Sequence, residues 1–114
     1  MSESYEIIAT PVFKLTLRKL CSFISSKYGS GTASQVRETI KQRVISLAEN
    51  PRSAPVSDRL EALGLTDYRQ LLVDSHNLIF YRVDEGAKKV ILVVAMDSRQ
   101  SLEQLLFEVT IALP

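Results

Sequence analysis

Apolar residues in the first half of the chain recur at the spacing of an amphipathic helix. A short alternating segment, SYEIIAT, is typical of a strand and precedes it. The apolar positions that follow repeat every three or four residues: Phe13, Leu17, Leu20 and Ile24. Thr10 can cap this helix, Pro11 suits its first position, and Gly29 and Gly31 end it. The pattern predicts a strand followed by a helix over residues 11–28.

A second helix is predicted directly after the two glycines. Thr32 and Gln35 have the spacing of a capping box at a helix start. One apolar stripe then continues through four positions: Val36, Ile40, Val44 and Leu47. The helix ends before Pro51, and the two helices are expected to form a hairpin. Residues 51–66 contain two prolines and no sustained period, which indicates a connection with at most one short turn of helix.

The second half changes to the alternating period of strands. Residues 68–99 form three alternating runs separated by DSHN and DEGAKK, which predicts an antiparallel meander. Asp97 and Gln100 again resemble a capping box, so a final helix is expected to bury three leucines: Leu102, Leu105 and Leu106. Residues 110–114 have no pattern that assigns an element. The predicted fold class is α+β in the order β-α-α-β-β-β-α, with the helix pair on one face of the sheet.

Composition narrows the function classes. A chain of 114 residues suits one domain, and no apolar run approaches the length of a membrane helix. The beginning of the sequence lacks a basic segment followed by an apolar one, so we expect a cytoplasmic protein without membrane association. Cys21 and His76 are too few for a structural zinc site, and no metal or cofactor is expected. Cys21 suits a buried apolar position.

Charge is unevenly distributed between the two halves. Residues 1–57 contain eight Lys and Arg against four acids, whereas residues 58–114 contain six against nine. A surface that contacts nucleic-acid phosphates is usually strongly basic. Such a surface would lie on the N-terminal half, where the basic residues also suit the solvated outer faces of the two helices.

Taken in order, these segments resemble the RelE/ParE superfamily of toxins from bacterial type II toxin–antitoxin operons. The resemblance extends over roughly residues 4–107 and joins the strand, the helical hairpin ending in LAENP, and the proline-containing link to the strand runs YRQLLVDSHNLIFYRVDE and KKVILVVAMDSR. Its most specific parts are Tyr68-Arg69 at the start of the second strand and the last strand leading into Arg99. The resemblance implies one toxin domain over residues 1–114.

The resemblance also implies where a ribonuclease site would lie. RelE-like members cleave mRNA on the ribosome with basic residues on two strands, an arginine after the last strand and a C-terminal tyrosine. Here Arg69 and Arg99 match two positions, but the others carry different residues: Leu71 or Val73, Asn77 and Leu105. A related branch has a terminal histidine–tyrosine pair, and this chain has neither residue after Tyr81. Because catalytic sets are strongly non-additive, these losses predict little intrinsic catalysis.

Five residues are candidates for function, and each has a structural alternative. His76 and Tyr81 are the candidates for acid–base catalysis, although a solvated turn position for His76 and a core position for Tyr81 are the favoured interpretations. Arg69, Arg82 and Arg99 are the candidates for target binding. The first two arginines can instead pair across strands with acids such as Asp84 or Asp97. Arg99 is expected in the first turn of the last helix, where the helix dipole disfavours a cation and a functional role is therefore favoured.

The absence of most of the RelE-like set makes the ParE branch the better match. That branch implies a toxin that arrests growth by binding a host target, DNA gyrase, and that serves plasmid stabilization together with a cognate antitoxin. Contact with operator DNA would then be indirect, through the antitoxin. The alternatives are a ribosome-dependent mRNA endonuclease with an atypical residue set, whose partners are the ribosome and mRNA, and a degenerate non-toxic member that only binds antitoxin and co-represses the operon.

Overall fold

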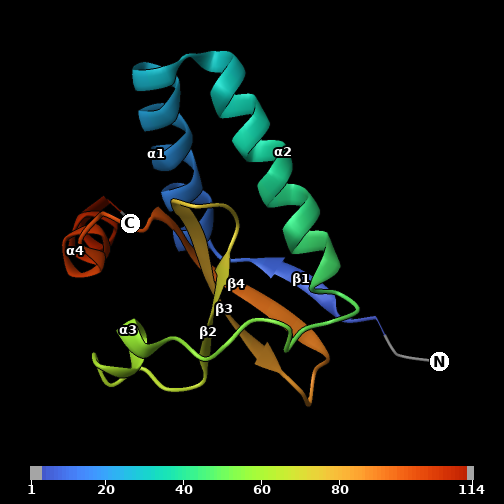
Figure 1. Ribbon diagram of the computed structural model, residues 1–114. Helices are drawn as coiled ribbons and strands as arrows, with labels where there is room; N and C mark the ends of the chain where they lie inside the picture. The colour runs from blue at the N-terminus through green and yellow to red at the C-terminus, as the bar shows by residue number, and fades with distance from the viewer. Residues whose placement is uncertain (1–3, 113–114) are drawn as a thin grey trace.

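The predicted order of elements is confirmed by the computed structural model, which describes residues 4–112 (Figure 1). Its elements are β1 (Glu6–Ala9), α1 (Pro11–Tyr28), α2 (Ser30–Ser46), α3 (Asp58–Glu61), β2 (Tyr68–Leu72), β3 (Asn77–Asp84), β4 (Lys89–Asp97) and α4 (Leu102–Ala112). Helix α3 is the single short turn within the connection. Ser57 caps it by accepting a hydrogen bond from the N–H of Leu60.

The strands form one four-stranded sheet in the order β1-β4-β3-β2. β2, β3 and β4 are the antiparallel meander, and β1 lies parallel to β4 with Glu6 opposite Lys89. A parallel pair requires a long crossover connection, which here contains the helical hairpin, α3 and the first two strands of the meander. β2 is therefore one edge of the sheet and β1 the other.

Each face of the sheet is covered by different helices. The hairpin of α1 and α2 covers one face, where Ile79 and Tyr81 of β3 are fully buried. α3 and α4 contribute to the other face, where Leu78 and Phe80 are buried. This separation follows from the alternation of side chains along a strand. The helix pair therefore lies on one face, as predicted, and the last helix packs on the opposite face.

Two predicted helix starts are wrong by a few residues. α2 begins at Ser30 after Gly29, whose positive φ of 98° suits glycine, and Thr32 donates a hydrogen bond to the carbonyl of Tyr28 instead of capping the helix. α4 begins at Leu102, where the hydroxyl of Ser101 accepts from the N–H of Gln104. The helix also continues to Ala112, through most of the segment that the sequence pattern left unassigned. Residues 113 and 114 lie outside the described part of the chain.

Thr16 of α1 satisfies a backbone group that the sheet leaves unpaired. The N–H of Ala95 points away from β3, and β1 ends too early to accept from it, since Ala9 pairs with Leu92. The hydroxyl oxygen of Thr16 accepts this hydrogen bond at 3.0 Å and donates its own proton to the carbonyl of Phe13. Thr16 is almost fully buried, so water cannot replace it.

Replacing Thr16 by valine is expected to lower the free energy of unfolding by about 1–3 kcal/mol, because the buried N–H of Ala95 loses its acceptor. Valine keeps the shape of threonine, so packing changes little. Thr39→Val is the matched control, since Thr39 is an exposed threonine of α2 whose hydroxyl also bonds to a helical carbonyl. Equal denaturation midpoints for the two variants would contradict this role of Thr16.

Candidate functional site

The turn between β4 and α4 presents Arg99 on a rigid support. The Asp97 carboxylate accepts hydrogen bonds from the Arg99 backbone N–H (2.8 Å), from Nε (2.9 Å) and from Nη2 (2.7 Å). The Asp97 N–H donates to Oε1 of Gln100 at 2.9 Å. The prediction that Arg99 lies in the first turn of a helix is wrong, because Asp97 and Gln100 form this separate turn and α4 begins at Leu102. Arg99 therefore lies outside the first turn of α4, and the helix dipole gives no reason for a functional role.

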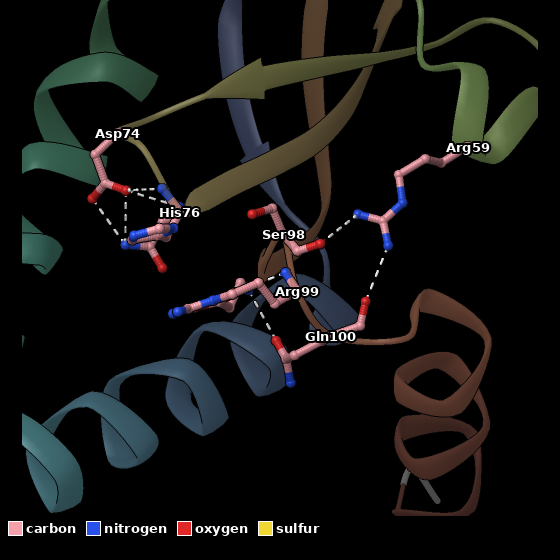
Figure 2. Close-up of polar contacts among 8 residues, drawn as sticks. Arg59, Asp74, His76, Ser98, Arg99 and Gln100 are labelled. Carbon is pink, nitrogen blue, oxygen red and sulfur yellow. Dashed lines mark hydrogen bonds and ion pairs between the residues drawn. The ribbon is translucent and has the colours of Figure 1, made fainter.

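Two neighbouring segments hold the same turn (Figure 2). Arg59 reaches from α3 and donates to the carbonyls of Ser98 (3.4 Å) and Gln100 (3.0 Å), which flank Arg99. From the other side, the N–H of Ser98 donates to the carbonyl of His76 at 2.6 Å. The backbone around Arg99 is thus fixed by α3 and by the β2–β3 turn. Arg59 was not among the predicted site residues, because no local pattern shows that a residue of the connection reaches the end of β4.

The β2–β3 turn is organised by Asp74. Its Oδ1 accepts from the backbone N–H groups of His76 and Asn77, both at 2.8 Å, and its carboxylate also accepts from Nδ2 of Asn77. The side chain of Asn77 is buried, and its Oδ1 has no hydrogen-bond partner among the described residues. His76 itself is exposed at the tip of the turn, as the structural alternative for it predicted.

The two carboxylates of this region favour their charged forms. The hydrogen bonds and positive charge of Arg99 lower the pKa of Asp97 despite the burial of the carboxylate. Burial raises the pKa of Asp74, but the hydrogen bonds from Asn77 and from the N–H of His76 outweigh this effect, and its pKa lies below the usual value. In return, Asp97 raises the pKa of Arg99. The cluster therefore holds an ion pair and contains no carboxyl group tuned to exchange a proton near neutral pH.

Beside Arg99 lies an open hollow of about 290 Å³ between the end of α1 and the turn. Arg99, Gln100 and Asp97 form one wall, and Phe23 and Lys27 form the other. Nζ of Lys27 lies 5.6 Å from the ring centroid of Phe23 and 5.6 Å from that of Tyr28. Exposed aromatic rings and two cations therefore share this surface, and such a surface favours binding of a partner.

Arg69 and Arg82 lie at the opposite end of β3. Arg82 pairs with Tyr68 and is five residues along the strand from Asn77, or roughly 17 Å. Arg69 pairs with Tyr81 and therefore points to the hairpin face, whereas Arg82 points to the face of α3. The predicted cross-strand pairs with Asp84 or Asp97 are not formed by Arg69, which donates instead to the carbonyl of Ala54 at 2.7 Å.

Tyr81 is a core residue. Its ring has no exposed surface, and its hydroxyl donates to the carbonyl of Pro51 at 2.7 Å. Burial raises the pKa of Tyr81, which disfavours the phenolate. Together with Arg69 it fixes the segment that follows α2 onto the sheet. Of the five predicted site residues, His76 and Arg99 are brought together, and Arg69, Arg82 and Tyr81 are kept apart from them.

Within residues 4–112, no three His, Cys, Asp or Glu side chains are grouped so that they could hold a metal ion. The same residues contain no helix with the length and apolar character needed to span a membrane.

Comparisons with known proteins agree with this architecture. The chain is similar to the chromosomal ParDE toxin–antitoxin system of P. aeruginosa at 15% identity and a TM-score of 0.68, with 84% of this chain and 98% of that chain covered. It is also similar to a mutant of the E. coli toxin RelE in the free state (17% identity, TM-score 0.60, 97% and 99% covered). A third similar structure is the intact E. coli RelBE toxin–antitoxin complex (21%, 0.57, 85% and 100%). At these identities the likeness concerns the fold. No curated protein sequence matches the chain.

Family membership comes from the sequence itself. Residues 7–102 match the family described as the ParE toxin of the type II toxin–antitoxin system, parDE. This match includes β1 from Ile7 onward, the helical hairpin, the whole meander and the turn that carries Arg99. The chain belongs to the ParE toxin family of type II toxin–antitoxin systems.

Proposed function

We propose that this toxin inhibits growth in the bacterial cytoplasm by binding a host target, DNA gyrase, and that it does so without intrinsic catalysis. The observation that carries the proposal is the separation of the polar candidates. A general acid or base must lie within hydrogen-bond reach of the proton that it moves. The buried hydroxyl of Tyr81 instead donates a hydrogen bond to the carbonyl of Pro51, and the guanidinium of Arg69 donates to the carbonyl of Ala54.

The exposed groups around Arg99 suit binding of a partner. Arg99 is held by Asp97 and by the turn that Arg59 fixes, so its guanidinium is presented with little freedom. Arginine in such an ordered position, next to exposed aromatic rings, is typical of residues that dominate binding energy at protein interfaces. In this proposal Arg99 is the principal contact to the target, and the toxin is neutralised by a cognate antitoxin, through which alone it would contact operator DNA.

Gyrase binding is tested by two assays on the purified toxin. We expect inhibition of supercoiling by gyrase, and no cleavage of mRNA on programmed ribosomes. Induction of the toxin without antitoxin is expected to arrest growth, with DNA replication stopping before translation. Normal growth on strong induction of folded protein would contradict the proposal and favour a degenerate member that only binds antitoxin.

A ribosome-dependent endonuclease is the second candidate, because His76 and Arg99 lie at neighbouring turns joined by the Ser98–His76 backbone hydrogen bond. An imidazole and a guanidinium at one site could together move a proton and stabilise a developing phosphorane charge. Cuts at defined codon positions, lost on His76→Ala, would establish this function instead.

A further inference from the structure

The tip of the helical hairpin projects beyond the sheet (Figure 1). α1 buries five of its residues, whereas Ile40 is the single buried residue of α2. The half of α2 that begins at Ser30 is therefore held mainly by its packing on α1. A contact that joined the two helices near the tip would stabilise a part of the fold that has little core of its own.

An open hollow of about 330 Å³ lies between the two helices in this region, and we call it the hairpin hollow. Polar side chains from both helices line it: Arg18, Ser22 and Ser25 of α1, and Ser30, Ser34 and Arg37 of α2. No acidic residue of the described chain contributes to its lining. Two positive charges and four hydroxyl groups therefore surround one small space.

The two helices supply these residues at the same spacing. Ser22 follows Arg18 by four residues, and Ser25 comes three residues later, so all three lie on one face of α1. α2 repeats this interval from Ser30 to Arg37. Because the helices are antiparallel, both arginines lie at the end of the hollow nearer the sheet, and the serines lie toward the tip.

The two arginines of the hairpin hollow have no counter-charge. Within residues 4–112, neither Arg18 nor Arg37 forms an ion pair or a hydrogen bond through its guanidinium group. Lys19, also on α1, differs because it pairs with Glu108 of α4 at 3.9 Å. Two like charges beside one hollow repel each other, and an anion bound between them would replace this repulsion by attraction.

The lining of the hollow suits a phosphate group. A phosphate monoester carries roughly two negative charges at neutral pH and has three acceptor oxygens, which match two guanidinium groups and several hydroxyl donors. A carboxylate has a single charge and would leave one arginine unbalanced. A nucleic-acid strand would need a row of cations along its length, rather than one enclosed pair.

We propose that the hairpin hollow binds the terminal phosphate of a small phosphorylated molecule. Arg18 and Arg37 are the charged contacts, and the serine hydroxyls are further hydrogen-bond donors. The bound phosphate would join α1 to α2 and so stabilise the projecting half of the hairpin.

This site is separate from the surface around Arg99. Phe23 and Lys27, which line the hollow beside Arg99, lie on the other side of α1 from Ser22 and Ser25. A phosphate in the hairpin hollow therefore leaves the proposed target contact uncovered. The inference goes beyond the proposed function and does not depend on gyrase being the target.

Titration of the isotope-labelled toxin by NMR, at constant ionic strength, tests the site directly. Inorganic phosphate and adenosine monophosphate are the probes, and adenosine without phosphate is the ligand control. Both probes are expected to cause saturable shifts of the Ser22, Ser30 and Ser34 amides, and adenosine is expected to cause none. Shifts caused equally by adenosine, or no saturable shift with either phosphate, would overturn the inference.

Two arginine variants and one lysine variant distinguish a built site from a generally basic surface. Arg18→Gln and Arg37→Gln are each expected to weaken binding of adenosine monophosphate by about tenfold or more, because each removes a charge-assisted contact. Lys41→Gln is the matched control, since Lys41 is an exposed cation one turn from Arg37 that does not line the hollow. Its effect is expected to be about threefold or less. Equal losses in all three variants would contradict the proposal.

Thermal unfolding provides an independent measurement. A ligand that binds only the folded state raises the melting temperature as its concentration increases. Inorganic phosphate is expected to stabilise the wild type and the Lys41→Gln variant, and to have little effect on Arg37→Gln, compared with chloride at equal ionic strength. A DNA strand without terminal phosphates that binds as tightly as adenosine monophosphate would instead indicate a general polyanion surface and overturn the inference.

Discussion

Alanine at position 81 is expected to lower the free energy of unfolding by about 3–5 kcal/mol, the usual cost of removing a large aromatic ring from a core. The ring of Tyr81 is fully buried between the sheet and the hairpin, and its hydroxyl satisfies the carbonyl of Pro51. Since domains are stable by only about 5–15 kcal/mol, this loss removes a large part of the free energy of unfolding and lowers the melting temperature. Chemical denaturation of the purified protein measures the loss.

Phenylalanine at the same position separates packing from the hydroxyl. Tyr81→Phe keeps the ring and is expected to cost only about 1 kcal/mol, since a single hydrogen bond is lost. Its inhibition of growth and of gyrase should be close to wild type once the protein is folded. A Tyr81→Phe variant that is stable yet non-toxic would show that the hydroxyl takes part in chemistry, and would contradict a purely structural role.

Arg99→Ala is expected to weaken gyrase inhibition about tenfold to a hundredfold, because one ordered, charge-assisted contact is lost at the centre of the proposed interface. Its free energy of unfolding should also fall, by about 1–3 kcal/mol, because the Asp97 carboxylate is only 10% exposed and loses two side-chain hydrogen bonds from Arg99, so inhibition is compared at a temperature where both proteins are folded. The measurement is the toxin concentration that halves supercoiling, compared with that of wild type.

Arg37→Ala is the matched control for this variant. Arg37 is an exposed arginine of α2 and lies away from the turn of Arg99, so its removal subtracts the same charge without touching the proposed contact. His76→Ala should be similarly mild. A catalytic site would respond differently, because deleting a general acid or base typically costs roughly 100- to 10,000-fold in rate. Equal inhibition by the Arg37 and Arg99 variants would remove Arg99 from the interface.

The elements of this fold were predictable where the pattern of apolar residues is local. The period of Phe13 to Ile24 and the alternation around Ile79 and Tyr81 follow from the geometry of a helix and a strand, whatever their surroundings. Helix starts were less predictable. Thr32 and Asp97 have capping-box partners at the right spacing, but α2 begins after Gly29, and the first turn of α4 is capped by Ser101. The sequence does not show which of the possible capping residues is used.

The site was predictable only in part, because its geometry depends on contacts between distant segments. Arg99 was singled out by the resemblance, as the arginine after the last strand, and His76 as the histidine of the turn DSHN. Their proximity comes from the pairing of Asn77 with Asp97, which the meander implies. Arg59 approaches from a segment without periodicity, and the partners of Arg69 are backbone carbonyls that no side-chain pattern reveals.

The parallel pairing of β1 with β4 has a consequence for synthesis. The two strands lie near opposite ends of the amino-acid sequence. The ribosome therefore makes β4 after the helical hairpin and the rest of the sheet. Contacts of such long sequence separation form late and slow folding. A nascent toxin therefore cannot complete its sheet, or fix the turn that carries Arg99, until nearly the whole domain has emerged. During that interval an antitoxin already present in the cell can meet a chain that is not yet capable of harm.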